Sequence, residues 1–122
     1  MADTLRQIHG VNVLECDPLG PLMRGGDATD RIGAAWSGEA SLVAIPLTRL
    51  DQGFLTLSTG IAGDIIQKFV NYGLRLAIVG DVTAATAASA ALRDFAYESN
   101  RGRHVWFVAD RDALAERLAD EA

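Results

Sequence analysis

Three small residues, Ser58-Thr59-Gly60, stand directly before an apolar helical pattern. A serine or threonine at this place caps the free N–H groups of a helix. The same N–H groups and hydroxyls can instead receive an anion or be offered to a kinase, and a phosphate there would change the affinity for a partner. Ser58, Thr59 and Gly60 are therefore candidate binding or regulatory residues, with capping as the alternative.

A second polar group follows on the same predicted helix. Gln67, Lys68 and Asn71 share one face, opposite the apolar stripe. Asn71 lies one turn beyond Gln67, so both can touch one ligand or partner. The alternative is a simple solvated face.

The segment Glu98-Ser99-Asn100-Arg101-Gly102 closes a later predicted helix. Asn and Gly are common where a left-handed residue ends a helix, so Asn100 and Gly102 are expected to terminate it. That role does not require Glu98 or Arg101. We take Glu98, Asn100 and Arg101 as further candidate binding residues.

Four aspartates lie near the predicted carboxyl ends of strands, which is the edge where open α/β sheets bind ligands. They are Asp17, Asp51, Asp81 and Asp110. Such carboxylates can bind a divalent cation, but Asp also turns chains into helices, and Asp110 has an evident capping role. We expect no metal and no cofactor. A small-molecule site at this edge, with polar groups from Asp81, Glu98 and Asn100, is a separate alternative.

Catalytic signatures are weak. His9 and His104 are the only histidines, and neither belongs to a Ser/His/Asp or Cys/His pattern. The chain has no phosphate-binding G-x-x-x-x-G-K-[ST] loop, no G-x-G-x-x-G after a strand and no H-E-x-x-H. The sequence favours a binding module over an enzyme.

Composition narrows the class of protein. The chain has 122 residues, 49% of them hydrophobic, which suits one globular domain over residues 1–122. With 11 basic and 16 acidic residues it carries a net charge of −5 without a basic stripe, so we expect no nucleic-acid partner. It has no apolar run long enough for a membrane span, and Cys16 has no second thiol to pair with. The first ten residues lack a basic start and an apolar core, so we do not expect them to act as a secretory signal. We expect a cytoplasmic protein.

Hydrophobic periodicity predicts five strands, two of which form an opening antiparallel hairpin around His9-Gly10. The strands are expected at 4–8, 11–15, 41–47, 74–80 and 104–109. Helices are expected at 27–37, 62–72, about 85–99 and about 111–119, with one helical turn near Phe54 and Leu55. In the third helix Ala84, Ala88, Ala91, Leu92 and Phe95 share one side, so this helix should approach its neighbour closely.

The order is therefore β-β-α-β-α-β-α-β-α. Helices join the last three strands, which requires parallel pairing, while the hairpin makes the sheet mixed. The fold class is a single-domain α/β fold.

This order, with a hairpin first, resembles that of the STAS domain (SpoIIAA-like), found in anti-sigma-factor antagonists and in the cytoplasmic tails of sulfate transporters. In the antagonists Asp-Ser-Ser/Thr-Gly-Leu-Gly opens the second helix. Here the corresponding segment is 57–63, LSTGIAG, with Leu57 in place of the acidic residue. The resemblance implies a regulatory role through protein contact.

More specifically, the chain resembles a family of bacterial proteins described as a domain of unknown function, number 4180. The resemblance rests on five segments: TGIAG at 59–63, QKF at 67–69, NY at 71–72, AIVGD at 77–81 and ESNRG at 98–102. That family implies a fold and a candidate surface and no activity.

The leading hypothesis is a non-enzymatic regulatory module that binds a protein partner through the start of the helix after Ser58. The alternatives are a small-molecule-binding protein or minor enzyme with its site at the carboxyl ends of the strands, and a structural homo-oligomer such as a homodimer. The oligomer is favoured if the alanine-rich helix is an exposed interface.

Overall fold

The computed structural model describes residues 3–19, 22–23, 25–50 and 52–121, with every side chain in those ranges except those of residues 25–28 and 52. One candidate carboxylate, Asp51, therefore lies outside the described residues. Within the described part of the chain, no helix has the length and apolar character that a membrane crossing requires.

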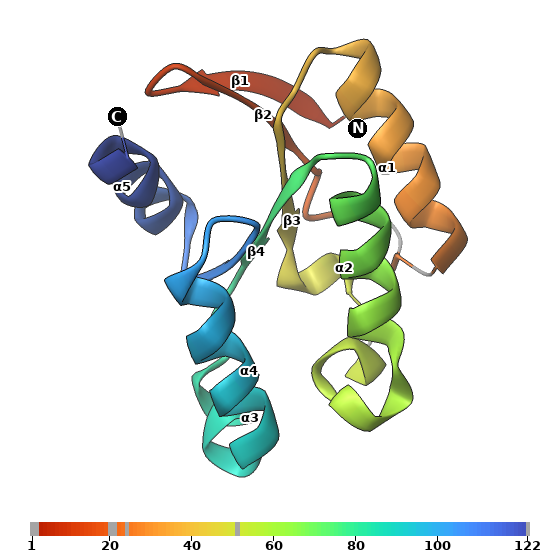
Figure 1. Cartoon of the computed structure of the whole chain (residues 1–122), viewed down its shortest axis with the longest axis vertical. Coiled ribbons are helices and arrows are strands. Elements are labelled where there is room, and N and C mark those ends of the chain that lie inside the picture. The colour runs from red at the N-terminus through yellow and green to blue at the C-terminus, as the bar shows by residue number, and fades with distance from the viewer. Residues whose placement is uncertain (1–2, 20–21, 24, 51, 122) are drawn as a thin grey trace.

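Five strands form one mixed sheet in which spatial order follows chain order, β1-β2-β3-β4-β5 (Figure 1). The strands are β1 (Thr4–Ile8), β2 (Val11–Glu15), β3 (Leu42–Pro46), β4 (Arg75–Val79) and β5 (Val105–Val108). The predicted antiparallel hairpin of β1 and β2 is confirmed, and β2 to β5 are parallel. The sheet therefore has β1 and β5 as its edges.

Five helices and three short 3-10 turns complete the described structure. The helices are α1 (Gly25–Ser37), α2 (Ile61–Asn71), α3 (Thr83–Ala88), α4 (Ala90–Arg101) and α5 (Arg111–Glu121). The turns at Leu47–Arg49, Gln52–Leu55 and Leu57–Thr59 fill the long link between β3 and α2, and the second confirms the helical turn expected near Phe54.

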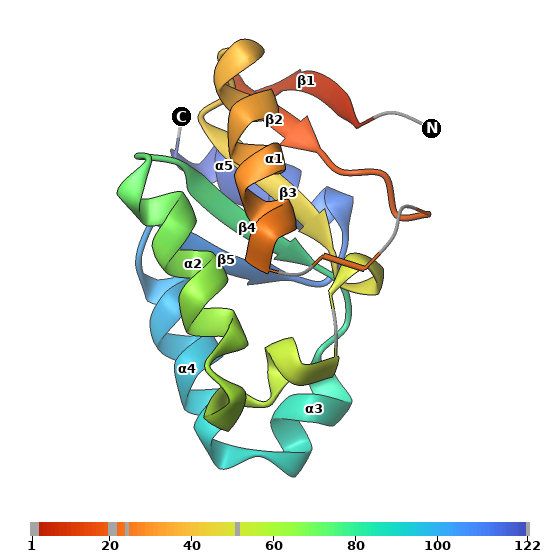
Figure 2. The same ribbon diagram turned by 90° about the vertical axis from the view of Figure 1, so that its right-hand side faces the viewer.

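The helices divide unequally between the two faces of the sheet. In Figure 2, α1 and α2 lie in front of the strands and α5 lies behind them. The front core joins alternate strand residues such as Leu14, Val43 and Ile78 to side chains of α1, α2 and α4. The rear core joins the intervening strand residues to Leu114 and Leu118 of α5.

Alternation along the strands produces these two cores. In β3, Val43 and Ile45 enter the front core while Leu42 and Ala44 enter the rear core. All four are buried, because successive side chains point to opposite faces of a sheet that is covered on both sides. The unbroken apolar runs of β3 to β5 follow from this arrangement.

Ion pairs hold both ends of α5 against the rear face. At its carboxyl end Glu121 accepts two hydrogen bonds of 3.0 Å from Arg75 of β4 and one of 2.9 Å from Arg103. Burial tends to raise the pKa of Glu121, but these arginine hydrogen bonds lower it below the ordinary value of 4.5. Between the two ends, the guanidinium groups of Arg75 and Arg117 lie 4.5 and 4.3 Å from the Trp106 ring centroid.

The prediction of one helix over about 85–99 was wrong. Ser89 has an extended backbone and separates α3 from α4, and its hydroxyl accepts a hydrogen bond of 3.1 Å from the Leu92 amide. A serine that caps a new helix stabilises the break, because it satisfies an N–H group that otherwise lacks a partner.

The expected close approach of an alanine face was also wrong. Ala84, Ala88 and Ala91 are exposed, while Leu92 alone of the expected face is fully buried and Phe95 is half-buried. The alanines carry too little apolar area to hold this segment against a neighbouring helix. An exposed alanine-rich helix is the feature that would favour a homo-oligomer. The homo-oligomer itself stays a prediction.

Asn100 also differs from expectation, since it does not end α4 in a left-handed conformation. It lies in the last turn of the helix, and Gly102 after it is extended at φ −93° and ψ −163°. The Asn100 side-chain oxygen accepts a hydrogen bond of 2.7 Å from the Phe107 amide of β5. Asn100 therefore supplies a partner for a backbone N–H group on an edge strand.

We expect Asn100→Ala to lower the free energy of unfolding by about 1–3 kcal/mol, because the part-buried Phe107 N–H loses its acceptor. Urea denaturation measures this effect. The matched control is Glu98→Ala, an exposed position on the same helix, which should change stability by less than about 0.5 kcal/mol. Equal stabilities for the two variants would contradict the role given to Asn100.

Candidate functional site

The residues at the start of α2 are exposed, and their polar groups serve the local turn. The Thr59 hydroxyl oxygen lies 2.7 and 2.8 Å from the carbonyl oxygens of Gly53 and Thr56, and it accepts a hydrogen bond of 3.3 Å from the Ile61 amide. Gly60 is left-handed at φ +78°, a conformation that other residues rarely adopt. The capping alternative therefore describes Thr59 and Gly60, while Ser58 is an exposed hydroxyl beside them.

The polar face of α2 is partly satisfied within the helix. Gln67 and Asn71, expected to share a ligand, are hydrogen-bonded to each other at 2.7 Å. Both are exposed, and Lys68 is half-buried. This mutual bond satisfies one donor and one acceptor of the pair without a ligand.

The three residues proposed for a small-molecule site do not lie together. Asp81 follows the carboxyl end of β4, whereas Glu98 and Asn100 are in the last turns of α4, just before the start of β5. A helix that connects two parallel strands returns to their amino ends, so these residues lie at opposite ends of the sheet. Glu98 instead pairs with Arg101 at 3.5 Å on an exposed helix face.

The aspartates at strand ends act as turn and capping residues. Asp81 accepts a hydrogen bond of 2.9 Å from the Thr83 amide, and hydrogen bonds to Thr83 lower the pKa of this carboxyl. Asp110 accepts one of 2.8 Å from the Ala113 amide, which confirms it as the cap of α5. The described residues hold no group of three His, Cys, Asp or Glu side chains placed to bind a metal.

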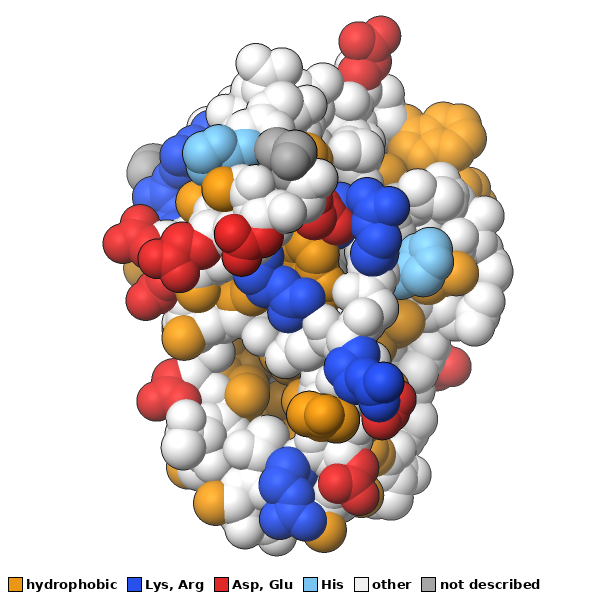
Figure 3. Space-filling view, turned by 60° about the vertical axis from the view of Figure 1, so that its left-hand side comes forward, with side chains coloured by type: hydrophobic (Ala, Val, Ile, Leu, Met, Phe, Trp, Pro, Cys, Tyr) orange, Lys and Arg blue, Asp and Glu red, His pale blue; other side chains and the backbone are white. Residues whose placement is uncertain are grey.

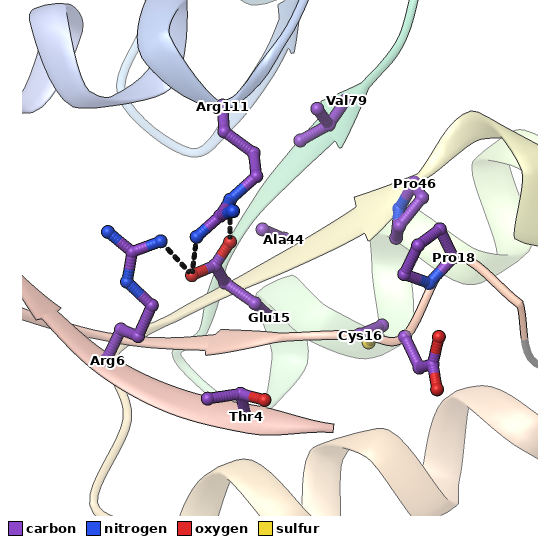
Figure 4. Close-up of a pocket in the computed structure, with 10 residues that line it drawn as sticks. Thr4, Arg6, Glu15, Cys16, Pro18, Ala44, Pro46, Val79 and Arg111 are labelled. Atoms are coloured by element: carbon purple, nitrogen blue, oxygen red, sulfur yellow. Dashed lines mark hydrogen bonds and ion pairs between the residues drawn. The ribbon is translucent and has the colours of Figure 1, made fainter. Parts of the chain in front are cut away.

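A pocket of about 410 Å³ opens at the carboxyl edge of the rear face (Figure 4). Its apolar part comes from Ala44 and Pro46 of β3, Val79 of β4 and Pro18 of the loop after β2. Thr4 of β1 lies across from them. This part of the sheet is open because α5 packs against the strands through Leu114 and Leu118, one to two turns beyond Arg111 at the pocket wall.

Three charged side chains from different elements form one wall of the pocket. Figure 4 shows Arg6 of β1 and Arg111 of α5 converging on Glu15 of β2. Arg6 Nη1 lies 2.9 Å from Glu15 Oε1, and Arg111 donates from Nε to Oε2 at 2.7 Å and from Nη2 to Oε1 at 3.2 Å. We call these three residues the charge cluster.

The carboxylate is the most buried member of the charge cluster. The Glu15 side chain is 14% exposed, against 44% for Arg6 and 63% for Arg111. Burial raises the pKa of Glu15 above 4.5, and the positive charge of Arg6 opposes this rise only in part. A carboxylate in this position holds the two guanidinium groups in place while their outer parts stay in contact with solvent.

A second set of ion pairs supports the loop on the other side of the pocket. The buried Arg49 donates a hydrogen bond of 2.8 Å to the Asp17 carbonyl, and the Asp17 amide donates one of 2.9 Å to Asp3. Asp3 also pairs with Arg31 of α1. These contacts fix the path of residues 16–18, which line the pocket.

The surface around α5 carries charges of both signs. Figure 3 brings this side forward and shows basic and acidic side chains next to one another, with hydrophobic side chains visible in hollows between them. A second hollow, of about 440 Å³, is bordered by Trp106, Arg103 and Glu121. Trp106 is the one large apolar side chain that lines it, whereas the first pocket has an apolar side next to its charge cluster, so the first pocket is the better candidate site.

Comparison with protein-family models matches residues 8–118 to the domain of unknown function DUF4180. The chain belongs to this family. The match begins at the last residue of β1 and ends within α5, so it includes Glu15 and Arg111 of the charge cluster but not Arg6. Neither the curated proteins nor the solved structures gave a match.

Sequence reasoning missed the pocket and its charge cluster. Arg6, Glu15 and Arg111 have no common motif, and 96 positions separate Glu15 from Arg111. One signal was present: in the hairpin Arg6 pairs with Val13, and Glu15 lies two positions beyond Val13, so Arg6 and Glu15 are on the same face. An ion pair across that hairpin was therefore foreseeable, but its third member was not.

Cys16 lines the pocket region yet is 3% exposed, and its side chain belongs to the front core. Burial raises the pKa of this thiol to about 11, although the positive charge of Arg49 opposes the rise. We expect the folded protein at pH 8 to react with a disulfide reagent such as DTNB at least about 100-fold more slowly than in urea, because the thiolate fraction is small.

The same experiment has a pH signature. In the folded protein the rate should keep rising toward pH 10, whereas in urea it should level off near the pKa of an ordinary thiol. A folded-state rate at pH 8 close to the rate in urea would show that Cys16 is accessible and ionised, contrary to the structure.

Proposed function

We propose that this protein is a binding module for a small molecule and that the pocket at the carboxyl edge of the rear face is its site. The observation that carries the proposal is the pocket itself: about 410 Å³, apolar on one side, with a charge cluster on the other. Ligand sites are concave, mostly apolar and supplied with a few fixed polar groups, and their volumes begin near this size.

The position of the pocket supports the same proposal. Ligands of open α/β sheets bind outside the carboxyl ends of the parallel strands. Here Pro46 and Val79 end neighbouring parallel strands, and Cys16 follows the end of a third. This agrees with the edge named as an alternative from the sequence, although different residues supply the polar groups.

The test is an NMR titration of the full chain with hexanol and with hexanoate. We expect saturable shifts at the amides of residues 15–17, 44 and 79 with at least one of the two compounds. Thr4→Phe should abolish them, because a large ring on an exposed edge-strand position would fill the pocket without changing the core.

The matched control is Gln7→Phe, which puts the same ring on the opposite face of β1. Shifts that survive in Thr4→Phe, or that disappear equally in Gln7→Phe, would place binding elsewhere and refute the proposed site. The absence of pocket shifts with both compounds would also refute it.

A second candidate function is regulation through protein contact at the start of α2, as in a STAS-like module. It is favoured by the exposure of Ser58, Thr59 and Gly60 at the mouth of the helix. Since the Thr59 hydroxyl is engaged in the turn, Ser58 is the better phosphate acceptor of the two. Gln67, Lys68 and Asn71 extend the same contact surface.

For this second function we expect a fraction of the protein isolated from its native host to carry one phosphate. Intact-mass analysis detects the added mass, and Ser58→Ala should remove it while Thr59→Val should not. Protein without phosphate under every growth condition would rule out the phosphorylation switch.

A further inference from the structure

We propose that the pocket selects an anion with a short apolar body and that a carboxylate or phosphate ester head binds to Arg6 and Arg111. This inference rests on the proposed small-molecule function, because it names the ligand class of the same pocket. It follows from the donors, the charge and the shape of the charge cluster.

The charge cluster has N–H donors to spare. Each guanidinium carries five N–H groups. Glu15 contacts one nitrogen of Arg6 and two of Arg111. The remaining N–H groups belong to side chains that are 44% and 63% exposed, so an incoming anion can reach them without displacing Glu15.

Glu15 is a positioning residue in this arrangement. It lies between the two arginines and draws their guanidinium groups to one point from β1 and from α5. The arginines therefore lose little conformational freedom when an anion binds, and a planar fork is well matched to carboxylate or phosphate oxygens. Two arginines that were mobile in solvent would bind the same anion more weakly.

The balance of charge favours an anion over a cation. Two arginines and one carboxylate leave the charge cluster with one excess positive charge. The other acidic residue at the pocket, Asp17, lies in the loop on the other side of it, where its carboxylate accepts a hydrogen bond of 2.9 Å from the Leu19 amide and its backbone is held by Asp3 and Arg49. Asp112 lines a different hollow, of about 190 Å³, on the far side of the charge cluster.

The apolar side of the pocket indicates that the ligand also has an apolar body. Ala44, Pro46 and Val79 present hydrocarbon surface next to the charge cluster. A ligand with an anionic head and a body of about six carbons satisfies both parts, since each buried CH₂ contributes about 0.8 kcal/mol. A fully polar anion such as inorganic phosphate would contact only Arg6 and Arg111 and leave the apolar side of the pocket unfilled.

The experiment compares four probes that share one chain: hexanoate, hexyl phosphate, hexanol and hexylamine. By NMR titration at low salt we expect hexanoate or hexyl phosphate to bind the pocket at least about tenfold more tightly than hexanol, because charge-assisted hydrogen bonds add to the same apolar contact. Hexylamine should bind more weakly than hexanol. The better of the two anions identifies the head group.

Variants connect the preference to the two arginines. Arg6→Met and Arg111→Met should each bring the affinity for the anion close to that for hexanol, while Arg93→Met, an exposed arginine of α4, should leave it unchanged. Raising the salt concentration should weaken anion binding in the wild-type protein and leave hexanol binding unaltered. The comparison of head groups uses only the wild-type protein, so it stands even where a variant is unstable.

The outcomes separate the two proposals. If no hexyl compound shifts the pocket amides, the proposed function falls and this inference falls with it. If hexanol binds in the pocket as tightly as hexanoate and hexyl phosphate, the small-molecule function stands and the choice of an anion is wrong. Tighter binding of hexylamine would likewise overturn the inference.

Discussion

The sequential order of the strands is the constraint on which the rest of the structure depends. Each parallel strand pairs with the next one in the chain, so every connecting helix steps in the same direction across the sheet. Crossover connections have one preferred hand, which places all the connecting helices on the same face. The front core follows directly, because α1, α2 and α4 are all connections between neighbouring parallel strands.

The rear face is covered by α5. This helix follows β5 at the edge of the sheet and turns back over the side opposite to α1 and α2. A single helix of 11 residues covers only part of five strands. The carboxyl edge of β2, β3 and β4 therefore stays open on that side, and the pocket is the uncovered remainder.

Charged side chains attach both ends of α5 to the rest of the structure. Arg111 reaches Glu15 at the start of α5, and Arg75 with Arg103 reaches Glu121 at its end. Between these ends only Leu114 and Leu118 of the helix are fully buried. The arginine at the pocket wall thus belongs both to the candidate site and to the attachment of the helix.

Local patterns in the sequence were enough to predict the strands and most of the helices. The apolar runs of β3, β4 and β5 and the stripe of α2 lie within a residue or two of their expected bounds. The break at Ser89 was missed because a run of alanines has strong helical propensity and one cap decides where it divides. Propensity is summed over a window, whereas a cap is a single hydrogen bond.

The candidate site needed information that no short segment contains. Asp81 and Asn100 were expected at the same carboxyl edge of the sheet, but α4 connects two parallel strands and ends at the amino end of β5, away from Asp81. The charge cluster joins β1, β2 and α5, and it exists only because α5 packs beneath the hairpin of β1 and β2. Contacts between side chains that are distant along the chain produce no periodic pattern in the sequence.

The edges of the sheet have a consequence for the solubility of this protein. A bare edge strand is a template onto which another chain can add a strand and begin an aggregate. On β5, Asn100 occupies the outward amide of Phe107, and on β1 a charged arginine stands at the centre of the strand and is tied inward to Glu15. Arg6 therefore contributes to the charge cluster and also makes it less favourable for another chain to pair with the edge strand β1.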